Sequence, residues 1–143
     1  LYKRGLIKLS VKDYKMAIKD FDNAIGLKSD QAEIYNKRGM AKDYLQDAAG
    51  ALSDFNSAIK IDEKVAEYYC NRGSVKFKMD NYSEAINDFS KAIELSNTYA
   101  MAHYRRASAR FNLGYKKEAC EDWEKALNLG IKEAANNIKQ YCN

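Results

Sequence analysis

The sequence predicts an all-α protein built as an array of helix–turn–helix repeats, and two observations carry this prediction. The first is the spacing of apolar residues within 66–99, where Ala85, Phe89 and Ala92 recur at about one helical turn and form the stripe of an amphipathic helix. The second is a period of 34 residues, after which the same residue types return along the chain. A fixed period of this length is typical of repeat arrays, in which each repeat contacts its neighbours.

The repeat is clearest at five registers, which hold a small residue, an arginine, an alanine, a large aromatic residue and an aspartate. Their members are Gly5, Gly39, Gly73 and Ala107; Arg4, Arg38, Arg72 and Arg106; Ala17, Ala51, Ala85 and Ala119; Phe21, Phe55, Phe89 and Trp123; and Asp20, Asp54, Asp88 and Asp122. They predict repeats at about 1–31, 32–65, 66–99 and 100–133, within a single domain covering 1–143.

The first repeat starts with a shortened helix, so we expect the chain to be a piece of a longer protein. Lys12 and Asp13 mark its turn, and Tyr14 is expected to open its second helix. Residues 27–31 form the joint to the second repeat. There Asp30 and Glu33 have the spacing of a capping box, which predicts that Asp30 caps the next helix.

The later repeats differ mainly at their turns and at the carboxyl end. The turn of the second repeat, 46–50, departs from the Asn-Tyr type of the third, and Gly114 lies at the turn of the fourth. Residues 131–142 carry another helical stripe with a polar opposite face, which predicts a capping helix over the last repeat. The amino-terminal end has no such cap, which suggests missing sequence or a partner there.

The series Tyr69, Gly73, Ala85, Phe89 and Ala92 resembles the tetratricopeptide repeat, and the resemblance covers nearly the whole chain in four copies. It implies a right-handed superhelical solenoid that binds protein segments. The family's frequent proline near the end of the second helix is absent, because the chain contains no proline. The carboxyl-terminal part resembles bacterial members of the family, which suggests a bacterial source and leaves cytoplasm and periplasm open.

In this family the first helix of each repeat lines a concave groove. Carried over position by position, the resemblance gives as groove candidates Asn36, Lys37, Met40 and Tyr44; Asn71, Ser74, Phe77 and Lys78; and Tyr104, Arg105, Ser108 and Asn112. Asparagine amides can bond a peptide backbone, since they both donate and accept hydrogen bonds. About half of the groove aromatics are expected instead to pack between repeats.

Some family members grip a carboxyl-terminal carboxylate with five lysine, asparagine and arginine residues. Here only Asn71 and Arg105 match, while Asn36, Met40 and Met101 occupy the other positions. The sequence therefore does not predict binding of a chaperone tail. Asn71 and Arg105 are still expected to contact one acidic or carboxylate group.

Composition argues against several classes of function. The net charge of +4 comes from scattered residues and does not indicate a nucleic-acid partner, and no apolar run predicts membrane insertion. His103 is the sole histidine and occupies a register of tyrosines, so we expect it to pack rather than to catalyse. No enzyme activity, cofactor or metal site is predicted. The recurring arginines and aspartates are expected to pair with one another rather than to bind an acidic ligand.

The chain has three cysteines and no CxxC motif, which excludes a zinc ribbon. If the last helices form an antiparallel hairpin turning near Gly130, Cys120 and Cys142 come close enough to form a disulfide that pins the cap. The alternative is a pair of small buried thiols. The disulfide would need an oxidising compartment.

Three functions remain after these exclusions. The leading one is a non-catalytic scaffold that binds a peptide or protein segment in its groove. The alternative is a self-assembly or spacer module of a larger protein, acting through its uncapped amino-terminal end. The third is RNA binding, which related helical repeats achieve with a polar code at fixed positions. Leu6, Met40 and Ser74 share one such register and provide no common polar group.

Overall fold

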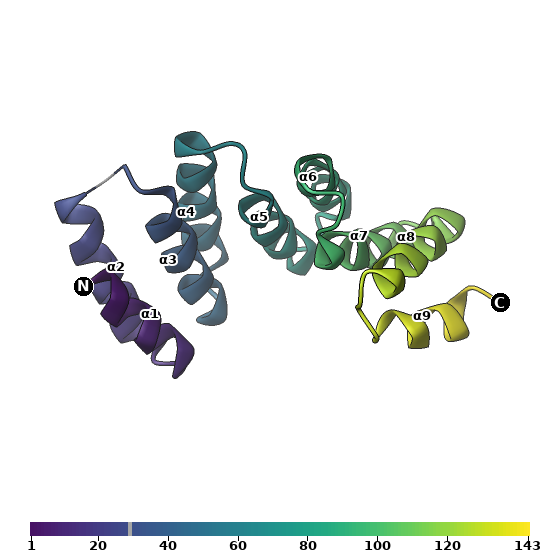
Figure 1. Cartoon of the computed structure of the whole chain (residues 1–143), viewed down its shortest axis with the longest axis horizontal. Coiled ribbons are helices and arrows are strands. Elements are labelled where there is room, and N and C mark those ends of the chain that lie inside the picture. Colours follow the sequence, from purple (N-terminus) through teal and green to yellow (C-terminus); the bar gives the residue numbers. More distant parts are fainter. Residues whose placement is uncertain (29) are drawn as a thin grey trace. The chain divides into compact units, whose positions relative to one another are not determined.

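A computed structural model of the chain describes residues 1–28 and 30–143, and these residues form nine α-helices and no strand (Figure 1). The helices are α1 (Tyr2–Ser10), α2 (Tyr14–Leu27), α3 (Ala32–Tyr44), α4 (Ala48–Ile61), α5 (Ala66–Lys78), α6 (Tyr82–Leu95), α7 (Ala100–Asn112), α8 (Lys116–Asn128) and α9 (Ala134–Tyr141). The predicted all-α repeat fold is confirmed, with two helices in each repeat. The predicted joint at 27–31 includes residue 29, which lies outside the described residues.

The contacts between Cα atoms divide the chain into two compact units, which are described separately below. Unit one covers residues 1–71 and holds α1 to α4 with the beginning of α5. Unit two covers residues 72–143 and holds the rest of α5 with α6 to α9. The organisation as one domain stays a prediction.

The small residue of each first helix lets the large aromatic residue of the second helix pack directly against it. In the second repeat a Cβ atom on Gly39 would lie 2.9 Å from Cε1 of Phe55, closer than such atoms approach. The Phe55 side chain is 1% exposed and fills the space between α3 and α4. In the fourth repeat Ala107 takes the glycine position, and the aromatic residue is Trp123. The helix pair therefore depends on one small residue facing one ring.

Each repeat also contains the predicted pair of an arginine on its first helix and an aspartate on its second. In the second repeat, Arg38 Nε donates to Asp54 Oδ2 at 2.9 Å and Nη2 donates to Oδ1 at 2.6 Å. The same two-pronged geometry joins Arg4 to Asp20, Arg72 to Asp88 and Arg106 to Asp122. The expectation of arginine–aspartate pairing is confirmed, and all four pairs lie within a repeat.

Within each unit, one arginine of these pairs also links neighbouring repeats. Arg38 Nη1 donates to Asp22 Oδ1 at 2.7 Å in unit one. Arg106 Nη1 donates to Ser90 Oγ at 3.1 Å in unit two. Asp22 and Ser90 occupy the same register of the repeat, two residues after the paired aspartate. The guanidinium therefore ties both helices of its own repeat to the second helix of the preceding one.

The turn inside each repeat contains one residue in the left-handed region of the backbone. The φ angles are 62° at Lys12, 64° at Gln46, 61° at Asp80 and 86° at Gly114. Only glycine adopts this conformation without steric cost, so the fourth repeat has the residue that the turn favours. The second helix then begins directly, at Tyr14 in the first repeat as predicted.

The helices α3 and α4 of unit one differ in how their first turns are capped. In the unusual turn of the second repeat, Asp47 caps α4 by accepting a hydrogen bond from the Gly50 amide at 2.9 Å. The predicted cap at Asp30 is wrong, because α3 begins at Ala32 and its N-cap residue is Gln31, with no side-chain hydrogen bond. The Asp30 carboxylate is thus not used in capping.

The capping helix α9 is shorter than the predicted 131–142, because Gly130, with φ of 105°, and the turn residues after it delay the helix until Ala134. It packs on the last repeat through Tyr141, whose ring centroid lies 4.5 Å from that of Phe111 and 5.9 Å from that of Trp123. The cap therefore covers the aromatic flank of α7 and α8. In the described part of the chain, no helix has the length and apolar character required to cross a membrane.

Candidate functional site

Three candidate residues of unit one, Asn36, Lys37 and Asn71, belong to one hydrogen-bonded cluster. Asn36 Nδ2 on α3 donates to Glu67 Oε1 on α5 at 3.0 Å, and Lys37 Nζ lies 3.1 Å from the same oxygen. Asn71 Nδ2 donates to Asn36 Oδ1 at 2.9 Å. Asn36 thus bonds both Glu67 and Asn71, which fixes the orientation of the half-buried Asn71 amide. The amide oxygen of Asn71 stays available to accept a hydrogen bond from another donor.

Asn36 itself does not lie on the exposed face where the sequence placed it. Its side chain is 0% exposed, and both its amide nitrogen and its oxygen are bonded within the unit. A buried amide needs such partners, which explains why the residue turned inward. Asn36 therefore supports Asn71 and Glu67 from beneath and has no surface with which to meet a ligand.

The two remaining candidates of α3 lie further along the helix. Met40 is half-buried, and Tyr44, near the end of α3, is 54% exposed. The Tyr44 ring stacks on Tyr14 of α2, with centroids 4.8 Å apart and planes inclined by 15°. Tyr44 therefore keeps one face against the first repeat and the other toward solvent, as an aromatic residue that receives an apolar side chain would.

In unit two the candidate with the most distinctive surroundings is Arg105 on α7. Its Nη1 donates to the Ser74 hydroxyl on α5, and it is half-buried. The next residue, Arg106, is instead held by both oxygens of Asp122, and Arg110 lies 2.7 Å from the same carboxylate. Among the described residues no carboxylate pairs with Arg105. Its charge is therefore uncompensated by any nearby anion of the unit.

Two aromatic candidates of unit two pack inside it. The Phe77 ring meets Tyr82 of α6 edge-on, with centroids 5.2 Å apart. Tyr104 lies in the cluster beneath the cap, and its hydroxyl donates to Asn137 Oδ1 of α9 at 3.2 Å. Both are half-buried, so each combines a packing role with a partly accessible edge.

The last three candidates are polar and lie toward the ends of their helices. Ser108 Oγ donates to the Tyr104 carbonyl at 3.3 Å, and Asn112 Nδ2 donates to the Ser108 carbonyl at 2.8 Å. Lys78 is exposed at the end of α5. These contacts to the helix backbone hold Ser108 and Asn112 in place, and Asn112 stays exposed.

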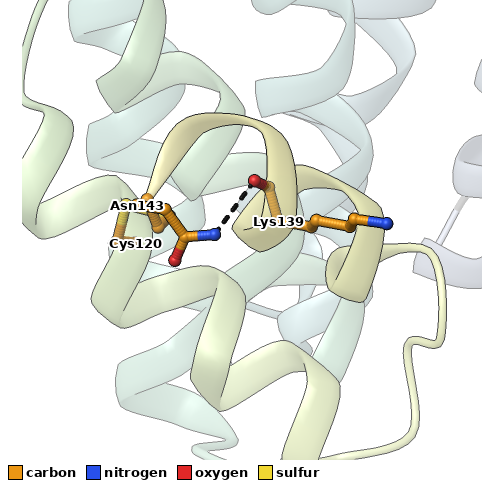
Figure 2. Close-up of a disulfide and its surroundings, with 4 residues drawn as sticks. Cys120, Lys139 and Asn143 are labelled. Carbon is orange, nitrogen blue, oxygen red and sulfur yellow. Dashed lines mark hydrogen bonds between the residues drawn. A yellow bond between two sulfur atoms is a disulfide. The ribbon is translucent and has the colours of Figure 1, made fainter.

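The structure joins Cys120 of α8 and Cys142, just after α9, in a disulfide (Figure 2). Their Cα atoms lie 5.7 Å apart, within the range that a disulfide spans. Beside it, Asn143 Nδ2 donates to the Lys139 carbonyl at 3.2 Å, which closes the end of α9. The third cysteine, Cys70, is buried and lies in α5.

The single histidine lies inside unit two, in the packed position that the sequence suggested. His103 is 6% exposed, and its Nε2 lies 2.9 Å from the Asn97 carbonyl oxygen. Its Nδ1 lies 3.7 Å from Asp122 Oδ1, the carboxylate already held by Arg106. The ring therefore packs between the loop before α7 and Asp122, bonded to the loop through Nε2.

Sequence reasoning missed one feature of unit one, a cavity of about 450 Å³ beside Tyr68. It is lined by Tyr2, Asp30, Gln31, Ala32, Glu33, Ile34, Ile61, Asp62 and Tyr68. These residues come from four helices and two connections, so no single motif marks them. The one signal in the sequence was the acidic pair Asp30 and Glu33, which was interpreted as a helix cap.

Comparison with known proteins gives a consistent result for the repeats. Family models described as tetratricopeptide repeat match residues 66–99 and residues 1–31, 32–65 and 100–129. Together these segments cover most of the chain, and their limits follow the period found in the sequence. No curated protein sequence matches the chain.

Solved structures with the same arrangement of helices were also found. A crystal structure of MamA matches with a TM-score of 0.82 and 24% identity, covering 91% of this chain and 77% of that one. The first TPR of Spaghetti (RPAP3), bound to the HSP90 peptide SRMEEVD, matches with a TM-score of 0.76 and 25% identity over 78% of this chain and 90% of that one. The second TPR of Spaghetti, bound to the same peptide, matches with a TM-score of 0.68 and 32% identity, covering 69% of this chain and 92% of that one.

Proposed function

Because the chain belongs to the tetratricopeptide repeat family, we propose that it is a non-catalytic scaffold for protein–protein interaction that binds a peptide segment on the first helices of its repeats. The two TPR domains of Spaghetti that resemble it were solved with a bound peptide, which supports this class of partner. The proposal further assigns the peptide contacts to residues of α3, α5 and α7.

The observation that carries the proposal is the environment of Arg105. Its guanidinium is half-buried, is positioned by Ser74, and has no carboxylate partner among the described residues. A guanidinium has five N–H donors, and a half-buried cation gains from a carboxylate or carbonyl supplied by a ligand. We therefore place an acidic side chain or a carboxyl terminus of the peptide at Arg105.

In unit one, Asn71 has the corresponding role toward the peptide backbone. Its amide is fixed by Asn36, so binding would cost little additional side-chain entropy. The amide oxygen accepts from a backbone N–H of the ligand, and its second N–H donates to a backbone carbonyl. Tyr44 adds an exposed aromatic face for an apolar side chain.

The test is selection of short peptides from a displayed library by the wild-type chain, followed by affinity measurement with variants. We expect the selected peptides to share a carboxylate and Arg105→Gln to weaken their binding by about tenfold or more, since a charge-assisted hydrogen bond is lost. Lys125→Gln removes an exposed cation of α8 and should leave affinity unchanged. Selection of no peptide, or equal affinities for Arg105→Gln and wild type, would refute the proposal.

A second candidate function, self-association through the amino-terminal end, is favoured by Ile7. In later repeats this register holds Ala41, Val75 and Ala109, which are 0% to 1% exposed, whereas Ile7 is 62% exposed. Ala41 lies in the core shared by the first two repeats, so the register is a surface on which repeats stack. Sedimentation analysis of wild type and Ile7→Asp tests this candidate: association that the substitution abolishes supports it, and a wild-type monomer excludes it.

A further inference from the structure

The cavity beside Tyr68 lies in unit one, where the connection between α2 and α3 and the connection between α4 and α5 meet the start of α1. Its volume, about 450 Å³, is large enough for a long side chain and too small for a folded element. Ala32, Ile34 and Ile61 form an apolar part of its wall. The rest of the wall is polar, and its charged side chains are all negative.

Among the described residues, three carboxylates line the cavity and no basic side chain does. Asp62 accepts one hydrogen bond from the Lys64 backbone amide at 3.0 Å, and Asp30 has no hydrogen bond or ion pair with the described residues. Glu33 has no basic partner among these residues and interacts with the Tyr2 hydroxyl. Glu67 nearby is different, because Lys37 and Asn36 satisfy it. A concave site with several unpaired carboxylates attracts cations, since its walls concentrate the negative potential.

The hydroxyl of a buried tyrosine provides an independent indication of a ligand. Tyr68 is 6% exposed and lines the cavity, yet its hydroxyl has no hydrogen-bond partner among the described residues. Polar groups of buried side chains are rarely left without a partner, so the Tyr68 hydroxyl at the cavity wall lacks a group that a ligand could supply.

The ionisation of the tyrosines is consistent with a negative cavity. Burial raises the pKa of Tyr68, and the carboxylates of Glu33 and Asp62 raise it further. Burial, followed by Glu33, likewise raises the pKa of Tyr2. Both hydroxyls are therefore neutral at physiological pH and can accept a hydrogen bond from a cationic donor.

The composition of the wall selects among cations. No group of three or more metal-ligating side chains is close enough to hold a metal ion in the described part of the chain, so the carboxylates are too dispersed for one. Two tyrosine rings and an aliphatic wall instead suit an organic cation, whose charge contacts the rings and whose methylene stem contacts the apolar wall. We propose that this cavity binds the lysine or arginine side chain of a protein partner.

This site uses residues other than Arg105 and Asn71, and it does not depend on the peptide-binding function proposed above. A partner could engage either site alone. Loss of binding at Arg105 would leave the cavity intact, and neutral substitutions in the cavity would leave Arg105 and Ser74 in place.

The test is an NMR titration of the full, isotope-labelled chain with acetylated and amidated tripeptides that carry lysine, arginine or norleucine between two glycines. Norleucine matches the lysine stem without its ammonium group. We expect the lysine and arginine peptides to shift the amide signals of residues around the cavity, with an effect that decreases as salt is added. The norleucine peptide should cause no such shifts.

Matched variants make the test specific. Glu33→Gln combined with Asp62→Asn should weaken binding by about tenfold or more, whereas Glu63→Gln removes an exposed neighbouring carboxylate that does not line the cavity and should have no effect. Tyr68→Phe removes the unpartnered hydroxyl and should weaken binding while the fold, checked by circular dichroism, is retained. Absence of shifts with wild type, or equal affinity for the lysine and norleucine peptides, would overturn the proposal.

Discussion

Arg38 and Asp54 form an ion pair that is almost entirely inside the protein: their side chains are 17% and 3% exposed, and two nitrogens of the guanidinium donate to the two carboxylate oxygens. The pairing with Asp54 raises the pKa of Arg38 further above its usual value. Lys42 Nζ lies 2.9 Å from the same carboxylate. The same register recurs in every repeat, so this pair is a structural element of the array.

The first prediction concerns removal of the Arg38 cation. Arg38→Met leaves the buried Asp54 with Lys42 alone, and breaking a buried pair in this way costs about 3 kcal/mol of unfolding free energy. Arg4→Met breaks the equivalent pair of the first repeat, where the arginine side chain is 60% exposed, and should cost less. Urea denaturation measures both, and equal losses would contradict the role assigned to burial.

The second prediction concerns the acid dependence of stability. The hydrogen bonds from Arg4 hold the pKa of Asp20 below its usual value. A carboxyl whose pKa is lower in the folded state stabilises the fold above its unfolded pKa, about 4, and loses this contribution as pH falls through its folded pKa. The unfolding free energy of wild type should therefore decrease in this acidic range. Asp20→Asn should show a weaker decrease, and an identical pH profile would refute the assignment.

The third prediction contrasts glycines in different conformations. Gly114 has φ of 86°, so Gly114→Ala should destabilise by about 1 kcal/mol or more. Gly26 lies within α2 with open space around its Cβ position, so Gly26→Ala should stabilise by about 0.5–1 kcal/mol. Thermal unfolding of the two variants should shift in opposite directions.

The same argument applies to the turn of the second repeat. Gln46 has φ of 64° and is exposed, so Gln46→Gly should relieve the left-handed conformation and stabilise by up to about 1 kcal/mol. Replacement of Gln46 by alanine serves as a control that removes the same side chain and keeps the strain. If both changes have the same effect, the backbone conformation is not the cause.

The fourth prediction concerns the disulfide at the carboxyl end. Titration of denatured, unreduced protein should find one thiol, Cys70, of the three cysteines. The bridge spans 22 residues, and a loop of that size corresponds to a loss of about 3 kcal/mol in the double variant Cys120→Ser, Cys142→Ser. A titration that finds three thiols would contradict the disulfide, and unchanged stability of the double variant would contradict its contribution to the unfolding free energy.

Much of the fold could be predicted from the sequence because its main contacts recur at fixed registers. Gly39 against Phe55 and Arg38 against Asp54 lie within one helix pair, and the same pairs return 34 residues later. Asn36 was misplaced because its direction depends on side chains of the next repeat, Glu67 and Asn71, and the register of Asn71 holds Lys37 and Arg105 in the repeats on either side. Local spacing specifies the repeat, whereas contacts between repeats depend on the particular residues present.

The cavity in unit one also could not be predicted from local spacing. Asp30 and Glu33 matched a capping pattern, but the helix began one residue later than the pattern requires. The Asp30 carboxylate then became available to the cavity, whose other residues come from distant segments. A one-residue difference in a helix start was enough to change the role of this side chain.

The position of the disulfide also determines how the end of the chain responds to a mechanical load. A pull on Asn143 passes through Cys142 directly to Cys120 in α8, so residues 121–141 carry no tension. Helix α9 is therefore shielded from force and stays docked until α8 itself yields. After reduction the same pull would act on α9 before it reached α8.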